Sequence, residues 1–139
     1  MSDLANLDRR ALERRIRALN QAVYLGEATA LCRLLGRYKF YVDTRDVGFG
    51  AQVLLDGYWE IWLAQFLARR VKPGMHAVDV GANHGCHTVL LADLVGPLGR
   101  VAAFEPSPGV CALHFADDAG ARGGYLEALT GCPGDFPLR

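Results

Sequence analysis

The sequence has no long apolar run, no excess of charge of either sign and no closely spaced cysteines. A membrane-spanning helix needs about 20 consecutive apolar residues, and no stretch of this chain approaches that length. Basic and acidic residues number 15 each, so the formal net charge is zero. Nucleic-acid binding is driven largely by excess positive charge. We therefore expect neither a membrane nor a nucleic acid as a partner.

The composition is that of an ordinary folded domain. Of the 139 residues, 51% are hydrophobic and 22% are charged, which argues against disorder. Residues 1–20 are charged and lack the apolar core of a secretion signal, so a cytoplasmic location is expected. In such a reducing compartment, isolated cysteines are typically reduced thiols. The cysteines are Cys32, Cys86, Cys111 and Cys132.

The pattern of residues 1–37 predicts an N-terminal helical segment. Apolar residues recur there every three or four positions, which places them on one stripe of a helix. Gly26 is expected to divide the region, with a second helix passing through residues 30–35. Residues 38–139 are then predicted to form the main domain.

The main domain contains a pattern that predicts a βαβ unit. Residues 75–80 form a short apolar stretch, a glycine-rich loop follows, and residues 88–95 have a helical pattern. A second apolar stretch covers residues 100–105. Buried parallel strands have such continuous apolar sequences, and the crossover between them is expected to be right-handed. No third strand is evident after residue 109. The fold class predicted is α/β, with N-terminal helices followed by a partial Rossmann-like βαβ unit.

The loop after the first strand, Gly81-Ala82-Asn83-His84-Gly85, carries the strongest functional signal and is called the glycine loop below. Glycines at this place let the chain turn sharply and a ligand approach closely. Glu105 ends the next strand, and parallel strands bring their carboxyl ends to one edge of the sheet. This carboxylate can therefore accept the hydroxyl protons of a ribose above the loop.

The spacing of the loop indicates which nucleoside it suits. A dinucleotide site has the pattern G-x-G-x-x-G, whereas Asn83 takes the middle position here. The loop therefore fits an adenosine ligand without a pyrophosphate better than NAD, which stays a minor alternative.

Two segments resemble a known family. Motif I of the class I S-adenosylmethionine-dependent methyltransferases is similar to residues 73–75 followed by 78–85, and the next motif is similar to residues 100–108. The strings Asp-Val-Gly-Ala-Asn-x-Gly and Ala-Phe-Glu-Pro resemble the FkbM-type methyltransferases in particular. Residues 54–60 also resemble the segment that precedes motif I. The resemblance covers residues 41–108.

This resemblance implies S-adenosylmethionine as cofactor and methyl transfer to a nucleophile, often a hydroxyl of a small molecule or saccharide. Glu105 matches the acidic residue that holds the ribose, and Glu60 matches a segment that closes over the cofactor. No catalytic residue can be assigned. The cofactor-binding residues that it implies are Asp79, Gly81, Ala82, Asn83, Gly85, Glu105 and Glu60.

A complete fold of this family has more strands than the residues after Val80 can form. We therefore expect a truncated chain, or one with an altered tail, in which residues 75–80 form an edge strand. An open edge invites pairing with another chain, and a homo-oligomer that covers it is one expectation. The alternative to an enzyme is a catalytically inactive remnant that binds the cofactor or only oligomerises.

A metal site is not expected beside the glycine loop. His84, Cys86 and His87 lie within four residues, but no second ligand pair stands nearby. Zinc needs three or four ligands that converge from suitable positions.

Overall fold

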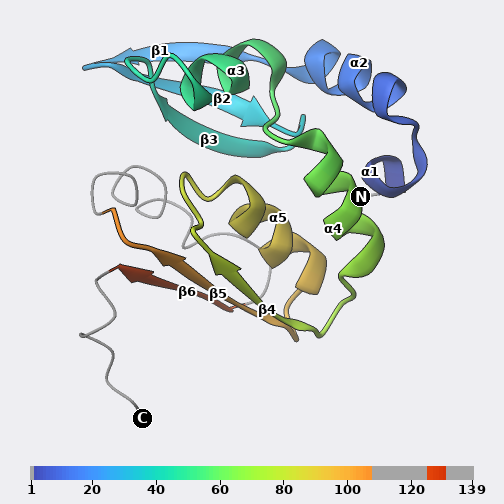
Figure 1. The fold of residues 1–139 in the computed structure, drawn as a ribbon. Coiled ribbons are helices and arrows are strands. Elements are labelled where there is room, and N and C mark those ends of the chain that lie inside the picture. The colour runs from blue at the N-terminus through green and yellow to red at the C-terminus, as the bar shows by residue number, and fades with distance from the viewer. Residues whose placement is uncertain (1, 108–124, 131–139) are drawn as a thin grey trace. The chain divides into compact units, whose positions relative to one another are not determined.

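The computed structural model describes residues 2–107 and 125–130. The chain folds into two compact units, Met1–Arg70 and Val71–Arg139, and each has its own three-stranded sheet (Figure 1). The predicted α/β class is confirmed, but the division falls after Arg70 rather than near residue 37. Within the described residues, no helix combines the length and the apolar character that a bilayer crossing requires.

In the first unit, an antiparallel sheet with the strand order β1-β2-β3 is combined with helices. The elements are α1 (Ser2–Asn6), α2 (Arg9–Leu19), β1 (Ala22–Gly26), β2 (Thr29–Leu34), β3 (Tyr38–Asp43), α3 (Phe49–Asp56) and α4 (Ile61–Arg70). Helix α3 contacts β2 and β3. The inner face of these strands is buried, and its side chains are Ala30, Cys32, Leu34, Phe40 and Val42.

The second helix predicted through residues 30–35 is wrong, because this stretch forms β2 of a hairpin. Its buried residues alternate with period two, as in a strand with one face against a core. Leu31 and Leu34 are three positions apart, and this is also the spacing of residues on one face of a helix. Positive φ values occur at the last residue of β1, Gly26, and at both turn residues before β2, Glu27 and Ala28.

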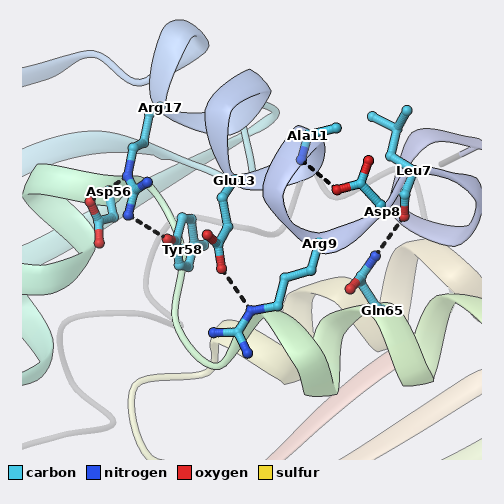
Figure 2. A network of polar contacts seen from close by, with 9 residues as sticks. All are labelled: Leu7, Asp8, Arg9, Ala11, Glu13, Arg17, Asp56, Tyr58 and Gln65. Carbon is cyan, nitrogen blue, oxygen red and sulfur yellow. Dashed lines mark hydrogen bonds and ion pairs between the residues drawn. The ribbon is translucent and has the colours of Figure 1, made fainter.

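A polar network joins α2 to the connection between α3 and α4 (Figure 2). Arg17 Nε donates to Asp56 Oδ1 at 2.8 Å, and Arg17 Nη2 donates to the Tyr58 hydroxyl at 2.8 Å. Gly57 is the C-cap of α3 and has a φ of +76°. At the other end of α2, the Asp8 side chain accepts from the Ala11 N–H and caps the helix.

The second unit contains the predicted βαβ arrangement. Its elements are β4 (His76–Val80), α5 (Cys86–Val95), β5 (Arg100–Glu105) and β6 (Tyr125–Thr130). β4 pairs with β5 in parallel, which confirms the prediction, and α5 packs against both strands (Figure 1). β6 also pairs with β5 in parallel. The expectation that no third strand follows is therefore wrong.

Strand β4 lies at an edge of the described sheet, as predicted, because the order is β4-β5-β6. Val78 and Val80 are 64% and 80% exposed, whereas Ala77 and Asp79 alternate with them and are half-buried. The oligomer expected to cover this edge stays a prediction.

Candidate functional site

The glycine loop is fixed to the end of the neighbouring strand by its backbone. The N–H groups of Gly81 and Ala82 both donate to the Phe104 carbonyl, at 2.9 and 3.0 Å. Gly81 has a φ of +75°, and no described atom lies within 4 Å of the place where its Cβ would stand. Glycine is therefore required here by backbone conformation, and the space beside it is open among the described residues.

Two further residues of the loop have left-handed conformations, Asn83 with a φ of +50° and Gly85 with a φ of +78°. Asparagine is one of the few side chains that tolerate this region, which explains how Asn83 can stand where the dinucleotide pattern has glycine. Gly85 caps α5, and its N–H donates to the Ala82 carbonyl at 2.8 Å. The first N–H groups of α5 have no acceptor within the helix.

The carboxylate of Glu105 lies against the same loop. Its Oε2 accepts from the Asn83 N–H at 2.8 Å, and its Oε1 accepts from the Ser107 N–H at 2.9 Å. These two backbone donors, one on each side of the carboxylate, hold it in a defined orientation. The acidic residue and the glycine loop thus share one end of the sheet, as the sequence predicted.

Asp79 connects β4 to the helix after the loop. Its Oδ2 accepts from the Thr88 hydroxyl at 2.6 Å, and Thr88 is fully buried. This hydrogen bond spans the glycine loop, because β4 ends before the loop and α5 begins after it. Sequence reasoning missed Thr88. The sequence feature that could have indicated Thr88 is a hydroxyl-bearing residue in the first turn of the helix that follows the glycine loop.

The structure brings together the predicted site residues that belong to the second unit. Those in the second unit form one site, and they are Asp79, Gly81, Ala82, Asn83, Gly85 and Glu105. Glu60 belongs to the first unit, where it directly precedes α4 with a φ of +40°. No cluster of three or more His, Cys, Asp or Glu side chains suited to a metal ion occurs within the described ranges.

This geometry defines a class of site. A glycine loop between a parallel strand and a helix, with a carboxylate at the end of the next strand, is the arrangement by which Rossmann-like folds bind nucleosides. Here the glycine loop lies between β4 and α5, and Glu105 supplies the carboxylate at the end of β5.

Comparisons with curated proteins point to methyltransferases. The chain is 42% identical over 74 residues to ribosomal RNA large subunit methyltransferase E of Halorhodospira halophila, an alignment that covers 48% of this chain and 34% of that protein. It is 34% identical over 80 residues to demethylmenaquinone methyltransferase of Symbiobacterium thermophilum, covering 57% and 31%. It is 43% identical over 44 residues to protein-L-isoaspartate O-methyltransferase of Triticum aestivum, covering 32% and 19%.

A solved structure supports the fold. A candidate transferase of Pyrococcus horikoshii aligns with a TM-score of 0.50 and 20% identity, covering 82% of this chain and 40% of that one. No protein-family profile matches the sequence. The chain spans about a third or less of the length of the curated relatives that it matches. Those relatives are named for different substrates, so they agree on methyl transfer and on no single acceptor.

Proposed function

We propose that this chain forms the cofactor-binding part of an S-adenosylmethionine-dependent methyltransferase. The observation that carries the proposal is the 2.8 Å hydrogen bond between Glu105 Oε2 and the Asn83 N–H. This bond keeps a carboxylate beside a glycine loop, where the ribose of an adenosine ligand would lie. The methyltransferase names of the curated relatives support the same class of reaction.

Each part of the site has a role in this proposal. Glu105 accepts hydrogen bonds from the ribose hydroxyls, because a carboxylate can accept several at once. The open space beside Gly81 and the start of α5 receive the methionine part, whose carboxylate suits a helix N-terminus. Asp79 does not need to touch the cofactor. Through Thr88 it fixes the helix that bears those N–H groups.

When bound, the cofactor supplies an electrophilic methyl group on a sulfonium. That methyl group would be available for transfer to a nucleophilic acceptor. The chain's own residues bind and orient the cofactor and keep water out. Residues 78–85 and 103–106 support a finer assignment to the FkbM type, with a hydroxyl oxygen of a small molecule or saccharide as acceptor. In that assignment Glu60 belongs to a segment that closes over the cofactor.

Calorimetric titration of the full chain tests the proposal. We expect saturable binding of S-adenosylmethionine and no binding of NAD at the same concentrations. Glu105→Ala should weaken binding by at least about tenfold, because a hydrogen bond to a charged group contributes about 1.5–3 kcal/mol. Glu27→Ala, which removes an exposed carboxylate in the first unit, is the matched control and should bind as the wild type does.

Two outcomes would overturn the proposal. One is an S-adenosylmethionine affinity that does not change in Glu105→Ala while circular dichroism reports a folded chain. The other is NAD binding that equals or exceeds S-adenosylmethionine binding, which would favour the dinucleotide alternative.

A further inference from the structure

The sheet of the first unit has a hollow that the methyltransferase proposal does not use. Its volume is about 260 Å³, and its lining is mainly apolar and includes basic side chains. Its lining includes Val23, Leu31, Arg33 and Lys39. No acidic side chain is among the described residues that line it.

The strand register places two like charges directly opposite each other in this hollow. Arg33 on β2 pairs with Lys39 on β3, and both side chains are exposed. Like charges that face each other across two strands destabilise a sheet. Neither side chain forms an ion pair within the part of the chain that the structure describes. The fold therefore retains a repulsion that an anion between the two strands would relieve.

Acidic residues elsewhere on this face do not neutralise the pair. Asp43 lies on the same face of the sheet, opposite Thr29 at the far end of β3, and it is bound by Arg45 at 2.6 Å. Positive charge is thus concentrated at one end of the hollow.

The other part of the hollow is apolar. Val23 and Leu31 are opposite each other in the register of β1 and β2, and Val23 is 60% exposed. Apolar surface of this kind, with a few convergent charges, is typical of a site for a small organic ligand.

We propose that this hollow binds a small phosphorylated organic molecule. The phosphate lies between Arg33 and Lys39, and the organic part lies on Val23 and Leu31. A phosphate ester carries about two negative charges near neutral pH, so it can compensate both members of the cross-strand pair, whereas a carboxylate carries only one. Guanidinium groups also bind phosphate oxygens through two parallel hydrogen bonds.

The test is an amide NMR titration of the full chain with 4-nitrophenyl phosphate. We expect saturable shifts at the amides of β2 and β3, and weaker binding of inorganic phosphate, which lacks the organic part. Arg33→Gln and Lys39→Gln should each raise the dissociation constant by about tenfold or more, because each removes a charge-assisted hydrogen bond. Arg14→Gln, on the exposed side of α2, removes the same charge elsewhere and should leave it unchanged.

Arg33→Glu separates a ligand site from a purely structural role. This substitution replaces a repulsive cross-strand pair by an attractive one, so the urea midpoint of the first unit should rise while binding of 4-nitrophenyl phosphate is lost. The proposal is overturned if 4-nitrophenyl phosphate gives no saturable shifts at β2 and β3, or if inorganic phosphate binds equally well. It is also overturned if decameric oligouridylate binds these strands when the aryl phosphate does not, since the surface would then recognise a nucleic acid.

Discussion

The hydrogen bond between Thr88 and Asp79 is expected to stabilise the second unit, and Thr88→Val isolates its contribution. Valine has nearly the shape of threonine, so the substitution removes the hydroxyl and leaves the packing of α5 almost unchanged. The Thr88 side chain is fully buried, and its Oγ1 lies 2.6 Å from Asp79 Oδ2. A hydrogen bond to a charged group contributes about 1.5–3 kcal/mol. Because Asp79 is only half-buried, water replaces part of the lost bond, and we expect a loss near about 1.5 kcal/mol.

Amide hydrogen exchange followed by mass spectrometry measures this loss where it should occur. A change of about 1.4 kcal/mol is a factor of about ten in an equilibrium constant, so amides of α5 and β4 should exchange about tenfold faster in Thr88→Val. Thr29→Val is the control, because the Thr29 hydroxyl makes only a long 3.4 Å contact with the Glu27 carbonyl. Unchanged exchange in α5 of Thr88→Val, or equal effects of both substitutions, would refute the reasoning.

Two further predictions concern the first unit. Burial raises the pKa of the Cys32 thiol to about 11 from 9.0, so the unfolded chain loses this proton at lower pH than the folded chain. Stability should therefore fall by up to about 3 kcal/mol as pH rises from 9 to 11, and urea midpoints at pH 8 and pH 10.5 should differ more in the wild type than in Cys32→Ala. Equal pH dependence of the two proteins contradicts this. Gly50→Ala should lower the free energy of unfolding by about 1–3 kcal/mol, seen as a lower urea midpoint, because a Cβ would lie 2.8 Å from the Asp43 carbonyl oxygen. Gly48→Ala, whose Cβ meets nothing closer than 3.5 Å, is the control, and a Gly50→Ala midpoint equal to that of Gly48→Ala would show that the backbone adjusts.

The second unit could be predicted well because its signals are local. A short apolar stretch, a glycine-rich loop and a helical pattern are consecutive in the sequence, and the parallel pairing of β4 with β5 follows from their order. The meeting of Glu105 with the glycine loop follows from the same topology, since parallel strands end at one edge. Thr88 was not predicted because its hydrogen-bond partner depends on the rotation of α5 about its own axis relative to β4. Residue spacing in the sequence does not determine that rotation.

The first unit was predicted less well because two periodicities compete in it. Residues 30–35 place leucines three apart as a helix does, while alternate residues are also apolar as in a strand. Tertiary packing against α3 decides between them, because only the alternating set forms a continuous buried face. In the second unit, β6 was missed because the glycines and prolines before and after it in the sequence are typical of a loop.

The division of the chain after Arg70 determines what a fluorescence experiment can observe. Trp59 and Trp62 are the two tryptophans of the sequence, and both belong to the first unit. Indole emission therefore follows the melting of that unit alone, whereas far-ultraviolet ellipticity averages over the peptide groups of both. Any separation between the two unfolding curves measures how independently the second unit unfolds from the first.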